Sequence, residues 1–114
     1  MQNKNIEKLI PIAMTVMEPY KNKFKKETSG YFSAFGPSVM MAGLHQTVLA
    51  YAGDDNKKTI NEIILKIYNQ MEWNSQNQNL NELVSRHKPL VKKRILEVVV
   101  ACKLVVGTYS LKDK

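Results

Sequence analysis

The sequence has only one cysteine and two histidines, and this scarcity excludes several kinds of site. Cys102 has no partner for an internal disulfide, so nothing indicates an oxidising compartment. Neither His45 nor His87 has a second histidine or a cysteine at a spacing typical of metal ligands. We therefore expect no bound metal, and we interpret Cys102, which lies in an apolar segment, as a buried structural thiol.

Long apolar runs are also lacking. The richest apolar stretch, residues 98–106, is interrupted by Lys103 and is too short to cross a bilayer. The first residues lead into a patterned segment broken by Pro11, without the apolar core of a signal peptide. These features predict a cytoplasmic protein that is not embedded in a membrane.

No arrangement of residues typical of a catalytic site is present. Acidic residues fall in expected loops or on exposed helix faces, where no environment would separate the pKa values of a catalytic pair. Asp54 and Asp55 lack the further oxygen ligands of a cation-binding loop. The glycines form neither a phosphate-binding loop nor a dinucleotide fingerprint. We expect a protein that is not an enzyme, uses no cofactor and works by binding.

What the sequence does have is apolar residues at helical spacing along most of its 114 residues. A chain of this length has room for one hydrophobic core, so we expect a single domain over residues 1–114. The predicted fold class is all-α, a small single-domain helical bundle of about five or six helices.

In the first half, residues 6–24 follow a helical pattern that Pro19 should kink or divide. Residues 28–30, Thr-Ser-Gly, predict a turn. A second helix should begin at Pro37 and run to about Tyr51. We interpret Gly43, inside that helix, as a point where a neighbouring backbone approaches closely.

In the second half, Thr59 and Glu62 fit a capping box at the start of a third helix. Residues 74–79 form a polar connection, and Asn79 with Glu82 can cap a brief fourth helix. The last helix should run from Pro89 to Tyr109; its valines would also suit a strand, but no second strand-like run could pair with it. Because this helix is apolar nearly all round after Glu97, we expect it to be central or covered by another chain.

Methionines and aromatic residues fit core positions better than binding sites. The five internal methionines fall mostly in apolar stripes, where filling gaps in the core is their usual role. Trp73 and Tyr31 stand at element ends and could stack on bases, but packing at a helix end is the more frequent arrangement. The methionines concerned are Met14, Met17, Met40, Met41 and Met71.

Positive charge is in excess, with 17 lysines and arginines against 10 acidic residues and a formal net charge of +7. This excess suits a polyanionic partner, and we favour nucleic acid. An acidic protein, a membrane surface, or basic residues without a functional meaning remain alternatives.

The basic residues gather in two groups. The helix dipole partly explains the first, at the end of the first helical region, because lysines are favoured at helix carboxyl ends. The second group surrounds the amino end of the last helix, where cations oppose the dipole, so it is the better candidate for contacts with a phosphate backbone. The first group contains Lys21, Lys23, Lys25 and Lys26, and the second contains Arg86, Lys88, Lys92, Lys93 and Arg94. From the first group we keep Lys21 and Lys25 as nucleic-acid-binding candidates.

Three segments together resemble one CRISPR family. Residues 36–44, Gly-Pro-Ser-Val-Met-Met-Ala-Gly-Leu, and 47–51, Thr-Val-Leu-Ala-Tyr, are similar to the proline-to-glycine-leucine signature of that family. Residues 94–104 are similar in character to its last helix. The family is the small helical subunit of the Cmr, or type III-B, effector complex. Here Gly36 and Ala42 replace the leucine and asparagine that the family usually has at these places.

The resemblance implies a structural role without an active site. Several copies would stack as a minor filament beside the subunits that carry the guide RNA, and would help to hold target RNA while other subunits cleave it. The preference for RNA over DNA rests on this resemblance. Two alternatives remain: a protein-interaction adaptor whose charge serves solubility, and a small DNA-binding regulator, although no recognition helix is evident.

Overall fold

Helices account for all the regular structure in the part of the chain that the computed structural model describes, which is residues 4–71, 73, 79–85 and 89–109. This confirms the predicted all-α class, and a radius of gyration of 13.2 Å fits one compact domain of this length. The elements are α1 (Lys4–Met17), the 3₁₀ helix η1 (Glu18–Lys23), α2 (Lys26–Ala42), α3 (Leu44–Ala52), α4 (Lys58–Gln70), α5 (Leu80–Ser85) and α6 (Pro89–Val106).

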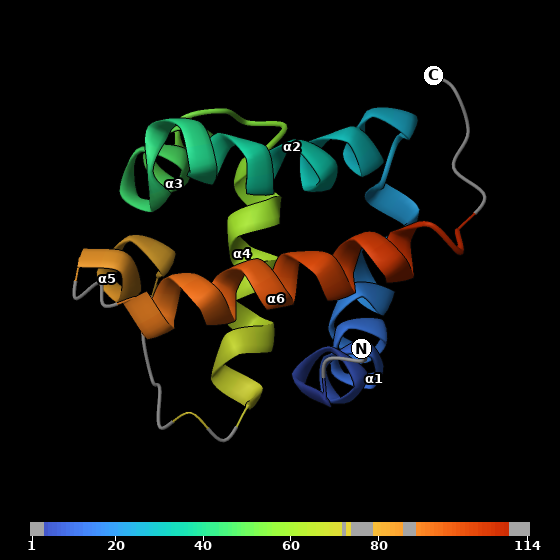
Figure 1. Ribbon diagram of the computed structural model, residues 1–114. Coiled ribbons are helices and arrows are strands. Elements are labelled where there is room, and N and C mark those ends of the chain that lie inside the picture. The colour runs from blue at the N-terminus through green and yellow to red at the C-terminus, as the bar shows by residue number, and fades with distance from the viewer. Residues whose placement is uncertain (1–3, 72, 74–78, 86–88, 110–114) are drawn as a thin grey trace.

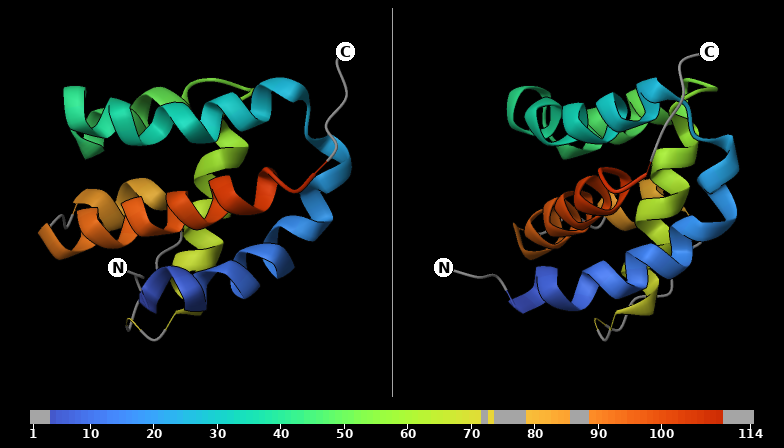
Figure 2. Two further views of the ribbon diagram at one scale, coloured as in Figure 1. Left: turned by 45° about the vertical axis from the view of Figure 1, so that its right-hand side comes forward. Right: turned by 90° about the vertical axis from the view of Figure 1, so that its right-hand side faces the viewer.

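Helix α6 is the centre of the bundle. It packs against α1, α2, α4 and α5, and it lies between the layers formed by α2 and α1 while α4 crosses all three (Figures 1 and 2). The helical interpretation of the last segment is therefore confirmed. One side of α6 is nonetheless open, because Val100 and Leu104 are 39% and 53% exposed. The buried residues of α6 are Ile95, Glu97, Val98, Val99, Ala101, Cys102, Val105 and Val106.

Helix α2 differs from the prediction. It continues from Lys26 through the expected turn at residues 28–30 and through Pro37. Thr28 is part of the helix start, since its hydroxyl oxygen accepts a hydrogen bond of 3.0 Å from the backbone N–H of Lys25. Burial of Phe32, Phe35 and Val39 along one face supplies the continuous contact that overrides the local turn signal.

The break between helices lies instead at Gly43, where α2 ends and α3 begins. The predicted close approach of a backbone is wrong: a Cβ at Gly43 would meet no atom within 4 Å. Glycine is required at this position because the backbone has a φ of +95° and a ψ of 158°, a conformation that residues other than glycine rarely adopt. Its carbonyl oxygen accepts hydrogen bonds from both the backbone N–H and the hydroxyl of Thr47.

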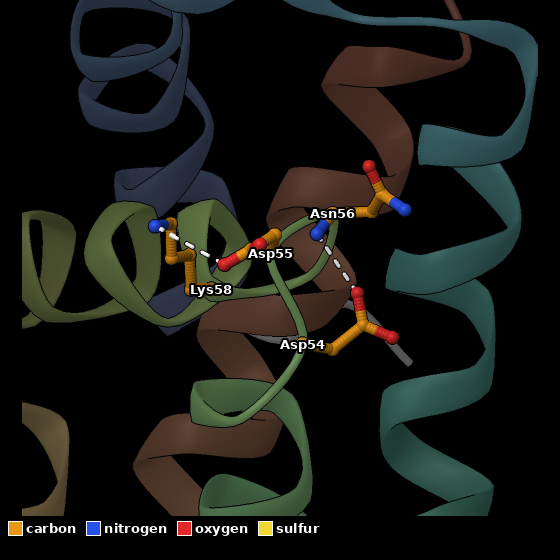
Figure 3. A network of polar contacts seen from close by, with 4 residues as sticks. All are labelled: Asp54, Asp55, Asn56 and Lys58. Atoms are coloured by element: carbon orange, nitrogen blue, oxygen red, sulfur yellow. Dashed lines mark hydrogen bonds and ion pairs between the residues drawn. The ribbon is translucent and has the colours of Figure 1, made fainter.

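The start of α4 also differs from the prediction. The helix begins at Lys58 without a side-chain cap, so the capping box is wrong. The preceding turn is held by a hydrogen bond of 2.8 Å from the backbone N–H of Asn56 to Asp54 Oδ1, and an ion pair of 3.5 Å joins Lys58 to Asp55 (Figure 3). The expected cap of α5 is present, because the backbone N–H of Glu82 donates to Asn79 Oδ1 at 2.7 Å.

The prediction that the methionines lie mostly in the core is wrong for three of them. Met14, Met40 and Met41 are 56%, 71% and 90% exposed. Met40 and Met41 follow the last buried residue of α2 on the face turned away from the core, whereas Met17 is fully buried. Three methionine side chains therefore contribute apolar surface that is open to solvent.

Replacing Gly43 with alanine should lower the free energy of unfolding by about 1–3 kcal/mol, because alanine is strained at this positive φ. The matched control is Gly36→Ala, at an ordinary helical position in α2 where an added Cβ also meets nothing. That substitution should raise stability by up to about 1 kcal/mol. Urea unfolding of both variants measures the difference, and equal effects would refute the role given to Gly43.

Candidate nucleic-acid interface at the start of α6

The strongest predicted site residues lie in the first turns of α6. Lys93 is exposed, and Lys92 and Arg94 are half-buried. Arg86 and Lys88, which were predicted to join them, lie outside the residues that the structure describes. The described members of this basic group are therefore the three cations of α6.

Lys92 and Lys93 stand beside an apolar groove of about 520 Å³. Leu96 and Val100 of α6 line one side of this groove. Met40, at the end of α2, also lines it. The spacing explains why these residues meet, since positions three, four, seven and eight residues apart share one face of a helix. The other lining residues are Ile6, Pro89 and Glu97.

The two lysines carry uncompensated charge. In the part of the chain that the structure describes, neither Lys92 nor Lys93 has an ion-pair partner. Glu97 lines the same groove, but the residue is only 6% exposed, and its Oε1 accepts a hydrogen bond of 3.2 Å from Asn5 Nδ2. Cations at a helix amino end are also repelled by the positive end of the helix dipole. An external anion would offset this repulsion and would give the two lysines an ion-pair partner.

Arg94 contacts an aromatic ring and does not line the groove. Its guanidinium lies over the ring of Trp73, 4.9 Å from the ring centroid. Trp73 in turn meets Tyr68 of α4 in an edge-to-face contact with centroids 4.8 Å apart. The structure thus supports packing for Trp73, and Arg94 joins α6 to the end of α4.

Replacing Arg94 with glutamine should therefore cost stability, by about 0.5–1 kcal/mol, because the cation over the Trp73 ring is lost. Lys93→Gln is the control: it removes the same charge from an exposed neighbour and should change stability by less than about 0.5 kcal/mol. Urea unfolding compares them. Equal losses would contradict the distinction between Arg94 and Lys93.

The first basic group lies at the other end of α6. Lys21 sits 5.0 Å from the ring centroid of Tyr109, which follows that helix. At about 1.5 Å rise per residue, the turn with Lys93 is about 20 Å from the end of α6 at Val106. The two basic groups do not form one patch.

The dipole explanation for the first group holds only in part. Lys21 and Lys23 stand in the last turn of η1, but Lys25 is the residue before α2 and Lys26 is its first residue. Lys23 and Lys25 line a polar hollow of about 280 Å³ together with acidic side chains, Glu27 and Asp55. This hollow is of mixed charge, which makes it a weaker anion site than the start of α6.

Several other cations lie over aromatic rings, a feature that the sequence did not predict. Lys57 stands 5.5 Å from the ring centroid of Tyr31 and 5.2 Å from that of Tyr51. Lys66 lies 4.9 Å from the ring centroid of Tyr20 and hydrogen-bonds to its hydroxyl. In the part of the chain that the structure describes, Lys21 and Arg94 make contacts of the same kind. No sequence signal marks these pairs, because most partners are distant in the chain.

The groups with reactive chemistry are in structural surroundings. Cys102 is fully buried, as predicted, and burial raises its pKa well above the ordinary range, so the thiol stays protonated at neutral pH. His45 is exposed and hydrogen-bonds to Asn81 Oδ1 at 2.9 Å. Among the described residues, no three histidine, cysteine or acidic side chains gather as a metal site, and no helix is long and apolar enough to cross a membrane.

Comparisons with protein-family models, with curated proteins and with solved structures found no match. The function of the chain has to be inferred from its own residues.

Proposed function

We propose that this protein is a non-enzymatic RNA-binding subunit that holds RNA by its phosphate backbone at the start of α6. The observation that carries the proposal is the pair Lys92 and Lys93, which have no ion-pair partner among the described residues and stand at a helix amino end. A net charge of +7 adds long-range attraction for a polyanion.

The chemistry of this contact would be independent of base sequence. Lysine ammonium groups act as compact point charges on phosphate oxygens, and each neutralised phosphate releases condensed counterions. Such a contact fixes a strand in place without reading it. This is the property that a subunit needs if the sequence is read by a guide RNA elsewhere in an assembly.

The resemblance to the small subunit of the Cmr complex supports RNA as the polyanion and a multi-subunit assembly as the setting. In that proposal, copies of this chain stack beside the subunits that carry the guide RNA, in the cytoplasm, and cleavage belongs to other subunits. The resemblance rests on residues 36–44, 47–51 and 94–104, which lie at the end of α2, in α3 and in α6.

The salt dependence of RNA binding tests this site. Fluorescence anisotropy of a short labelled single-stranded RNA, measured between about 50 and 200 mM salt, gives the slope of log affinity against log salt. The Lys92→Gln/Lys93→Gln variant should reduce the magnitude of that slope by about 1.4, since each lost phosphate contact on a single strand contributes about 0.7.

The control removes the same charge elsewhere. Lys58→Gln/Lys66→Gln changes two lysines of α4 that already contact Asp55 and Tyr20. This variant should keep most of the wild-type slope. A slope that falls equally in both variants would show that net charge alone binds RNA, and an unchanged slope in Lys92→Gln/Lys93→Gln would refute the site.

A second function, a protein-interaction adaptor, is favoured by one observation. The lysines at the start of α6 stand beside an apolar groove, and apolar grooves are typical of protein docking. A subunit of an assembly can bind both RNA and protein. The adaptor interpretation differs in requiring no RNA at all.

A further inference from the structure

Exposed apolar side chains gather around the groove beside α6. Met40 and Val100 line it and are 71% and 39% exposed. Ile6 and Leu96 line it as well and are only partly buried. The amino ends of α1 and α6 and the carboxyl end of α2 lie toward one side of the molecule in both views of Figure 2. Contiguous exposed apolar surface on a protein is a common feature of sites that bind partners.

We infer that this groove docks an amphipathic α-helix of a partner protein, whose apolar face is flanked by acidic side chains. The inference goes beyond RNA binding and names a second partner by its chemistry, one that would compete with RNA for Lys92 and Lys93 on the same copy of the chain. The apolar strip of the partner would lie against Met40, Leu96 and Val100, with its carboxylates at Lys92 and Lys93.

Charge complementarity selects an acidic partner. Both lysines at the groove edge lack an ion-pair partner in the described residues. The one acidic lining residue, Glu97, is 6% exposed and already accepts the hydrogen bond from Asn5, so it offers little negative charge to a ligand. The same groove on a second copy of this chain would present the same two lysines, so two such grooves would not complement each other in charge.

The lining residues favour an aliphatic helix over a nucleobase. No aromatic side chain stands among the described lining residues, whereas proteins that bind single-stranded RNA bases usually stack them on aromatic rings. Docking of a strand needs an exposed sheet edge, and the described part of this chain has only helices. Met40 adds a flexible side chain that can adapt to the residues of a partner helix.

The probe for this inference is a fluorescently labelled synthetic peptide. It places leucines three and four residues apart along one helix face, with glutamates on both sides of that face. A second peptide of the same composition distributes its leucines evenly around the helix. Binding of each to the nuclease-treated full-length protein is measured by anisotropy.

The Met40→Gln/Val100→Thr variant should weaken binding of the amphipathic peptide by about tenfold or more, because both changes put polar atoms into the groove. The matched control is Met14→Gln, which alters an exposed methionine of α1 outside the groove and should bind as the wild type does. Circular dichroism checks that all three proteins keep the same helix content.

The outcomes also separate this inference from RNA binding. Met40→Gln/Val100→Thr should leave the salt slope for RNA unchanged, since no lysine is lost. Equal binding of the two peptides, or full binding by Met40→Gln/Val100→Thr, would overturn the docking site even if RNA binding holds. A wild-type dimer that this variant dissociates in sedimentation would overturn it in favour of a second copy.

Discussion

Burial of one face of α6 is the constraint on which the rest of the structure depends. Ile95, Val98 and Cys102 are fully buried where α1, α2 and α4 converge on this helix. Apolar residues packed on one face leave the other face open, because a helix can be enclosed on all sides only by a larger bundle. The open face, with Val100 and the lysines before it, is therefore a product of the fold, and it supplies both proposed contacts.

The positive charge of the protein is divided between two uses. Arg94, Lys21, Lys57 and Lys66 lie over aromatic rings that belong to other segments of the chain. Lys92 and Lys93 have no comparable contact in the described residues. The net charge does not distinguish among these cations, so on that basis each is an equal candidate for binding RNA. Their surroundings separate those that stabilise the fold from those that remain for a ligand.

The sequence predicts most of the fold because the helices follow local apolar patterns. The long helix from Pro89 and the cap at Asn79 are recoverable in this way. Gly43 is different, since a glycine needed for positive φ and one needed for close packing look alike in a sequence. The exposed Met40 and the contact of Arg94 with Trp73 depend on tertiary packing. The basic group at α6 was predictable, but the apolar groove beside it was not.

Recovery of the protein with its natural partners tests the central claim most directly. The tagged chain would be purified at low salt from its own cells, and the mass of the assembly would be measured before and after ribonuclease treatment, with any bound RNA sequenced. The account predicts an assembly that contains RNA and other subunits and that loses mass on treatment. An assembly that holds its partners without RNA, and that ribonuclease leaves unchanged, would contradict the claim.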